Sequence, residues 1–175
     1  MSDLEEAARR VAAGDRAAFD AIVRSTQKPL LRVAARVLGS REDALDVLQD
    51  AYLRAFDTLV EGGFDGRSRV SSWLYRVVVN ASIDALRARR RRVTAPLPAQ
   101  EAIAGEANGE VRVALADLGR MLDLLPVEQR AALVLRELEG LSNAEAAAVL
   151  ETTEGAIEQR LIRARATLRR QFDES

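Results

Sequence analysis

Apolar residues recur every three or four positions along most of the chain, which is the spacing of one face of an α-helix. The clearest stripe, between Asp43 and Val60, comprises Leu45, Leu48, Tyr52, Phe56 and Leu59. Glycine followed by a capping residue interrupts the pattern at Gly14 and Asp15 and again at Gly39 and Ser40. Pro29 should start or bend a helix, because its ring removes a backbone donor. We predict an all-α fold.

A loop and an unusually basic helix follow these first helices. Residues 61–69, "EGGFDGRSR", hold three glycines and predict a loop. Ser71 or Ser72 is a candidate cap for the next helix, which ends at residue 92 with five arginines in its last six positions. Its polar side comprises Arg76, Asn80, Asp84, Arg87 and Arg91, and its apolar side Leu74, Val77, Val78, Ala81 and Ala85.

The middle of the chain predicts a boundary between two small helical domains. Residues 93–111 contain two prolines, two glycines and glutamates with weak periodicity, which is typical of an extended linker. We expect one domain at residues 1–92 and another at 112–175. Hydrogen exchange should find residues 95–108 unprotected in the isolated chain.

The second domain contains a candidate helix-turn-helix. A helix opened by Pro126 is followed by a short helix, a tight turn and a longer helix that ends in arginines. Ser142 or Asn143 can cap the short helix, and Thr152 or Thr153 the long one. Glu151 stands where the turn usually has glycine, so an ordinary helical hairpin stays an alternative. Small or apolar residues that could hold the two helices together are Ala147, Leu150, Ile157 and Leu161.

Composition excludes several kinds of chemistry. The chain of 175 residues has no cysteine and no histidine, which removes disulfides, thiolate nucleophiles, imidazole bases and the usual zinc ligands. Carboxylates such as Asp43, Asp46 and Asp50 are more simply a solvated or docking face than a metal site. We therefore expect no enzyme, metal or cofactor. No apolar run approaches the roughly 20 residues of a membrane span, and the acidic start is unlike a signal peptide, which predicts a cytoplasmic location.

Charge is distributed unevenly along the chain. The net charge is only -1, yet residues 1–92 carry 17 basic and 13 acidic side chains, against 9 and 14 in the remainder. Trp73 could fill the core while the arginines form a solvated helix end. Alternatively, rings and a glycine-rich loop receive unstacked bases while arginines hold phosphates, as in proteins that bind single-stranded nucleic acid. The two interpretations are compatible if Trp73 is partly buried.

Three stretches together resemble bacterial RNA polymerase sigma factors of the extracytoplasmic-function (ECF) type. They are "LGSREDALDVLQDAYLRAF", "FDGRSRVSSWLYRVVVNASIDALRARRRR" and "LPVEQRAALVLRELEGLSNAEAAAVL" with the "TEGAIEQRLIRARATLRR" that follows it. The resemblance implies polymerase-binding residues at Asp43, Asp46, Gln49 and Asp50. It implies contacts with the promoter -10 element at Arg67, Arg69, Trp73, Tyr75, Arg76, Asn80, Arg87, Arg90 and Arg91. It implies contacts with the -35 element at Thr153, Glu154, Ala156, Glu158, Gln159, Arg160, Arg163 and Arg165.

The chain departs from the family pattern at three of these places. Leu45 replaces a common glutamate in the polymerase-binding helix and extends the apolar stripe. Glu158 stands where lysine is frequent and Gln159 where serine is frequent. Glutamate repels phosphates but can accept from cytosine, and glutamine can pair with adenine. A known -35 preference therefore does not carry over to this chain.

The resemblance implies a subunit that binds core RNA polymerase and promoter DNA, helps melt the -10 region, and is held by an anti-sigma factor. It implies neither a small-molecule substrate nor insertion into a membrane. One alternative is a sigma mimic that titrates an anti-sigma protein, although the arginines at 87–92 and at 160, 163 and 165 disfavour it. Another is a helix-turn-helix regulator of duplex DNA alone, which would not require the loop and rings of the first domain.

Overall fold

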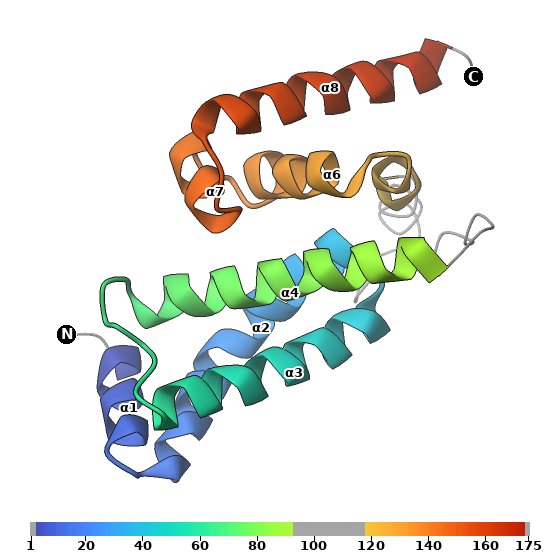
Figure 1. Ribbon diagram of the computed structural model, residues 1–175. Coiled ribbons are helices and arrows are strands. Elements are labelled where there is room, and N and C mark those ends of the chain that lie inside the picture. The colour runs from blue at the N-terminus through green and yellow to red at the C-terminus, as the bar shows by residue number, and fades with distance from the viewer. Residues whose placement is uncertain (1–2, 93–117, 174–175) are drawn as a thin grey trace.

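Figure 1 shows a computed structural model that describes residues 3–92 and 118–173. Four helices form the first domain: α1 (Asp3–Ala12), α2 (Phe19–Leu38), α3 (Arg41–Val60) and α4 (Val70–Arg92). Helix α2 packs against both α3 and α4, and α1 lies across their ends. The described residues contain no strand, which confirms the all-α prediction. The predicted linker at 93–111 lies outside the described residues.

Glycine and serine end and begin helices where the sequence predicts. Gly39 adopts a left-handed φ of +71° after α2, and Ser40 Oγ accepts a hydrogen bond from the Asp43 N–H at 3.2 Å. The first break differs in detail. Asp15 precedes a single 3₁₀ turn, η1 (Arg16–Ala18), without a side-chain cap. Its carboxylate accepts from Arg10 Nε at 3.0 Å. Asp15 thus occupies the N-cap position of this short turn and not that of α2, whose N-cap is Ala18.

Pro29, expected to start or bend a helix, does not start one, because it lies inside α2, which begins ten residues earlier at Phe19. The predicted serine cap of the next helix is wrong. Helix α4 begins at Val70, so Ser71 and Ser72 lie exposed in its first turn. The Trp73 N–H already donates to the Arg69 carbonyl at 2.9 Å. The loop therefore ends one turn earlier than the serines suggest.

The buried face of α3 is offset from its predicted stripe. Leu48, Tyr52 and Leu59 are buried as expected, whereas Leu45 is 48% exposed. Alanines at 44, 51 and 55 complete the buried face, because α2 and α4 approach α3 closely there. Tyr52 is anchored by a 2.7 Å hydrogen bond to Thr26 Oγ1. Leu45 is thus a surface residue and does not extend the core.

The second domain is a small helical unit with the predicted turn. Residues 118–123 are helical, and α6 (Val127–Leu133) continues into a π-helical turn, η2 (Val134–Leu138). Helices α7 (Asn143–Val149) and α8 (Glu154–Asp173) follow and pack together. Ser142 caps α7 in a reciprocal box with Glu145, and Thr153 Oγ1 accepts from the Ala156 N–H at 3.2 Å. These caps set the direction in which α8 leaves the turn.

The second domain lies along α4 and the end of α2. Helices α6 and α7 both contact α4, and η2 contacts α2. In Figure 1, α8 is the outermost helix of the second domain and lies on the side away from α4. No helix within the two described ranges is long and apolar enough to cross a membrane.

Candidate nucleic-acid interfaces

The glycine-rich loop and the start of α4 bring the predicted rings together. Phe64 of the loop and Trp73 of α4 are both half-buried, with ring centroids 4.9 Å apart and planes tilted by 44°. Arg76 donates to Ser68 Oγ at 3.2 Å, which ties the loop to the helix. Trp73 therefore supports the loop and keeps part of its ring accessible, consistent with both interpretations of this residue.

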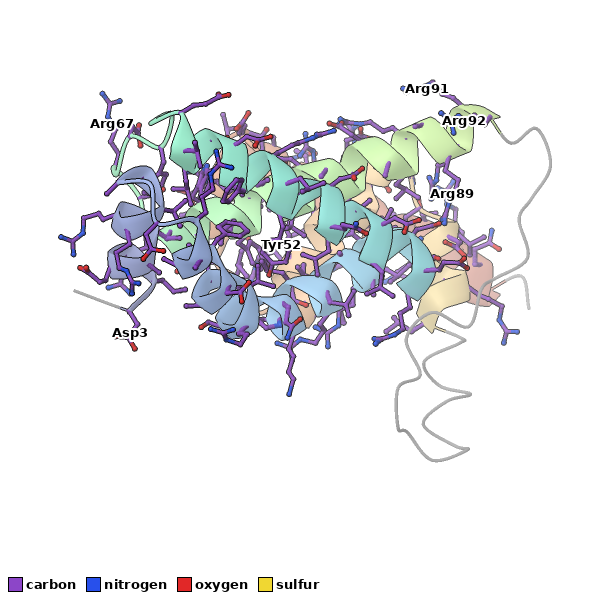
Figure 2. The ribbon with its side chains drawn as sticks, turned by 90° about the horizontal axis from the view of Figure 1, so that it is seen from below. Asp3, Tyr52, Arg67, Arg89, Arg91 and Arg92 are labelled. Carbon is purple, nitrogen blue, oxygen red and sulfur yellow. The ribbon has the colours of Figure 1, made fainter. Side chains whose placement is uncertain are left out.

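The predicted arginines of the loop extend into solvent. Arg67 and Arg69 are exposed. Arg67 lies 3.5 Å from the carboxylate of Asp65, and this pair is strongly solvated. Figure 2 shows Arg67 at one end of the molecule and Arg91 and Arg92 at the other. Exposed basic groups thus lie at both ends of α4.

Tyr75 lies beneath the second domain. Its hydroxyl is buried and finds no hydrogen-bond partner among the described residues. Burial, reinforced by the negative charge of Glu139 from the second domain, raises the pKa of this hydroxyl far above its usual value. The hydroxyl therefore lies near charged groups from both domains, Glu139 of the second and Arg32 and Arg36 of the first.

Asn80 and Arg160, predicted to meet different DNA elements, line the same cavity. Its volume is about 280 Å³, and its wall includes Arg87 from α4 and Glu128 and Leu150 from the second domain. Asn80 and Arg160 are each half-buried. The second domain therefore covers the centre of the predicted -10 face.

Arg87 is held by carboxylates on both domains. Its Nε and Nη2 donate to Glu128 Oε1 at 3.1 and 3.0 Å, and its Nη1 donates to Asp84 Oδ1 at 3.0 Å. The hydrogen bonds that Arg87 donates to Glu128 are the main reason why the pKa of Arg87 is raised. Burial opposes ionisation of Glu128, but a backbone N–H and Arg87 lower its pKa overall. Three of the five N–H groups of Arg87 are thus engaged in this arrangement.

The arginine-rich end of α4 is divided between structural and free side chains. Arg90 Nη1 donates to the Leu125 carbonyl of the second domain at 2.7 Å. Arg89 donates to the Leu38 carbonyl at 2.9 Å and to Asp43 at 2.8 Å, both within the first domain. Arg91 and Arg92 are exposed.

Sequence reasoning missed Arg130, a fully buried arginine that links the domains. It forms an ion pair with Asp123, and its Nη2 donates to the Arg36 carbonyl at the end of α2 at 3.3 Å. A Cβ on Gly39 would lie 2.6 Å from the same nitrogen, so only glycine leaves it room. Arg36 reaches back to the Leu138 carbonyl at 2.9 Å. The sequence signal was an arginine on the otherwise apolar face of α6.

The helix-turn-helix presents most of its predicted -35 residues to solvent. Thr153, Glu154, Glu158, Gln159 and Arg163 are exposed, and Ala156 is half-buried. Arg165 is exposed and forms an ion pair with Glu137 at 2.7 Å. Most of this face of α8 is open, although Arg160 at its edge lines the cavity that it shares with Asn80 of α4.

The predicted polymerase-binding residues lie along one exposed part of α3. Asp46, Gln49 and Asp50 are exposed, while Asp43 is engaged by Arg89. Leu53, 58% exposed, lies on the same part of the helix and was not predicted. Within residues 3–92 and 118–173, no three acidic side chains gather closely enough to hold a metal ion.

Comparisons with known proteins agree with this organisation. The family model "Sigma-70 region 2" matches residues 22–92 and "Sigma-70, region 4" matches residues 115–168. The chain is 44% identical over 169 residues to the ECF RNA polymerase sigma factor SigM of Mycobacterium tuberculosis, covering 97% of this chain and 84% of that relative. It is 34% identical over 172 residues to the ECF RNA polymerase sigma-E factor of Escherichia coli, covering 89% and 87%.

A solved structure extends the likeness to the arrangement of the fold. CnrH, in complex with the cytosolic domain of CnrY, is 28% identical and superposes with a TM-score of 0.69 over 99% of each chain. Both units of this chain are therefore similar to units of known sigma factors.

Proposed function

The chain belongs to the ECF sigma factors of bacterial RNA polymerase, and from this premise we propose which of its surfaces bind polymerase and which read promoter DNA. The observation that carries the assignment is the presence, in one chain, of a ring-bearing loop beside a basic helix and of a helix-turn-helix with an open face. The domains are assigned to residues 1–92 and 112–175. The chain acts by binding and needs no catalytic residue or cofactor.

The first domain binds the melted -10 element. The loop at 61–69 and Trp73 lie where unpaired bases can stack, and Asn80 offers an amide that can read a base edge. Arginines at 67, 69, 76, 87, 90 and 91 supply positive charge along the displaced backbone. Melting costs stacking energy of about 1.4 kcal/mol per step, and these contacts offset it.

The exposed part of α3 binds core polymerase. Asp46, Gln49 and Asp50 present carboxylates and an amide, and Leu45 and Leu53 add apolar area beside them. An apolar patch edged by polar groups is typical of a protein interface. Asp43 contributes indirectly, because its bond to Arg89 joins α3 to α4.

The domains separate when α4 engages DNA. Arg87 and Arg90 donate to the second domain, and Asn80 lines a partly open cavity whose other wall is the second domain. A melted strand can reach these groups only after α6 and α7 move away. Binding of core polymerase supplies the free energy, since it favours the separated form.

A cytoplasmic anti-sigma protein favours the opposite form. The related CnrH has been solved in complex with the cytosolic domain of CnrY, and we assign this chain a partner of the same kind. Such a partner would hold the α4 face covered.

Transcription in vitro tests the proposed function. Purified core polymerase with this chain should start RNA at defined sites on genomic DNA, whereas a sigma mimic or a duplex-only regulator would give no specific starts. Asn80→Ala should then slow open-complex formation more on a duplex promoter than on one with a pre-melted, scrambled -10 segment. Gln27→Ala, an exposed amide on α2, is the matched control. Equal behaviour of Asn80→Ala and wild type on both templates would remove the base-reading role.

A further inference from the structure

The exposed face of α8 has an uncharged ridge at its centre. Gly155, Gln159, Ile162 and Ala166 follow one another at spacings of four, three and four residues. At about 100° per residue they fall on a single line along the helix. The opposite side holds Ile157, Leu161 and Ala164, which are buried in the domain. The ridge therefore points away from the core.

Ile162 stands out on this ridge. It is 56% exposed. Single exposed apolar residues are common on protein surfaces, so exposure alone assigns no role. The surroundings of Ile162 are what distinguish it.

Basic side chains lie along both margins of the ridge. Helical spacing places Arg163 and Arg170 on one side of it and Arg165 and Arg169 on the other, and all four are exposed. Arg163 makes no ion pair with another described residue. Glu158 lies on the same margin as Arg165 and Arg169, beside Gln159, so both margins are basic from Ile162 to Arg170. An uncharged strip between two such margins is complementary to a DNA major groove, whose floor presents bases and whose two edges are phosphate strands.

The two side chains at the centre of the strip match one kind of base pair. Glutamine can pair with the edge of adenine, and an apolar side chain can contact the C5-methyl of thymine. Ile162 follows Gln159 by about 4.5 Å along the helix axis, close to one base-pair step. Gly155 and Ala166 are small enough to let the helix approach the groove floor.

We propose that Ile162 is a specificity residue that packs on the C5-methyl of a thymine in the -35 element, adjacent to the base pair read by Gln159. The inference rests on the proposed function, since it requires α8 to enter the -35 major groove. The occupant of the ridge is duplex DNA, and a protein partner is the alternative that the experiment separates.

The test removes the methyl without changing the protein. The holoenzyme, made from core polymerase and the full chain, first selects sites from a promoter library randomised at the -35 element. Each thymine of the selected site is then replaced by deoxyuridine, which lacks the methyl and keeps its hydrogen bonds. We expect one position to lower promoter affinity about 4-fold, the effect of one buried methyl-sized group.

Ile162→Ala identifies the side chain that senses the methyl. It should weaken binding to the thymine promoter and abolish the response to deoxyuridine at that one position, while Ile162→Val keeps part of the response. Leu124→Ala is the matched control, because Leu124 is an exposed apolar residue of the same domain, 48% exposed, that lies outside α8.

Three outcomes overturn the proposal. The selected sites could lack a fixed thymine, deoxyuridine could act equally in wild type and Ile162→Ala, or Ile162→Ala could lower transcription equally on all promoters without any dependence on the methyl. The last outcome would assign the ridge to a protein partner. Failure of the proposed function looks different, since wild type would then give no specific start on any promoter.

Discussion

The two faces proposed to meet promoter DNA differ in how far their polar groups are already engaged inside the molecule. On α4, Arg87 and Arg90 donate to the second domain and Asn80 lines a partly open cavity between the domains. On α8, Gln159, Ile162 and Arg163 are exposed. The chain as described therefore exposes most of its proposed -35 residues. Of its proposed -10 residues, Arg67, Arg69 and Arg91 are exposed, whereas Asn80, Arg87 and Arg90 lie against the second domain. We expect these last three groups to meet DNA only after the domains separate.

Loss of Arg130 should reduce the difference in accessibility between the α4 and α8 faces more than any other change. Arg130→Ala removes a buried charge that bonds both Asp123 and the Arg36 carbonyl. Asp123 is 40% exposed and stays solvated, so the main loss is the charged hydrogen bond to the Arg36 carbonyl across the domains, about 1.5 to 3 kcal/mol. We expect the domains to separate, with a larger radius in solution X-ray scattering and tighter binding of single-stranded -10 DNA. Arg163→Ala, which removes an exposed arginine of the same domain, should change neither radius nor single-strand binding. An unchanged radius for Arg130→Ala would show that other contacts hold the domains.

Gly39→Ala tests the same contact from the first domain. The new Cβ would meet Arg130 Nη2 at 2.6 Å and would sit at a φ of +71°. The left-handed φ alone costs about 1 to 2 kcal/mol, and displacement of Arg130 adds to it. In the Arg130→Ala background only the cost of the φ should remain, so the two effects on the free energy of unfolding should not add. Strict additivity in denaturant titrations would mean that Gly39 and Arg130 are not coupled.

Glu158→Lys should increase the difference between the two faces by strengthening DNA binding at α8. Glu158 is exposed beside the ridge, and its replacement exchanges a phosphate-repelling group for an attractive one. We expect the isolated chain to bind duplex DNA several-fold more tightly, with a salt dependence steeper by about 0.9 per added phosphate contact, and a looser -35 preference. Glu42→Lys on α3 makes the same change of net charge away from α8. An identical gain for Glu42→Lys would attribute the effect to net charge alone.

Glu128→Gln should weaken the contact between the second domain and α4 by a smaller amount. Glu128 and Arg87 are each 44% exposed, and solvated pairs contribute about 0 to 1 kcal/mol. Single-stranded -10 binding should therefore rise at most about 5-fold at low salt and converge with wild type at high salt. Asp20→Asn, which removes the carboxylate of an exposed pair with Arg24 on α2, should leave binding unchanged. A gain that persists at high salt would contradict an electrostatic origin.

The ion pair between Arg87 and Glu128 determines how the contact between the two domains depends on pH. The pKa of Glu128 is lowered in the folded chain, so its contribution is present above the unfolded-state pKa of about 4.3 and is lost as pH falls through the folded pKa. The chain has no histidine to titrate between pH 6 and 8. The radius of the chain measured by solution X-ray scattering should therefore stay constant between pH 6 and 8.

The sequence predicted periodic features well and interdomain features poorly. Helix breaks at Gly14 and Gly39 follow from backbone geometry that is local to a few residues, and both are confirmed. The exposure of Leu45 was missed because periodicity gives the spacing of a stripe but not which neighbouring alanines α2 and α4 approach. Arg130 was missed for a related reason, since an arginine looks solvent-facing until a carbonyl on another domain is placed beside it. The proposed DNA and polymerase contacts stay predictions.

The smallest expected effect concerns the turn at Glu151, which connects α7 to α8. Glu151 adopts a left-handed φ of +49°, where glycine is usual, and an L-residue there costs about 1 to 2 kcal/mol. Glycine would relieve this strain but lose more backbone entropy on folding, about 0.5 to 1 kcal/mol, so Glu151→Gly should stabilise the second domain by about 0.5 to 1 kcal/mol. Ala148→Gly, at an exposed helical position of α7, should instead destabilise it by about 1 kcal/mol. Because the fold of the turn is unchanged, duplex affinity of Glu151→Gly should equal that of wild type. A stabilised variant with altered duplex affinity would mean that the left-handed turn at Glu151 determines the orientation of α8. The accessibility of α8 to DNA would then depend on this turn as well as on the position of the first domain.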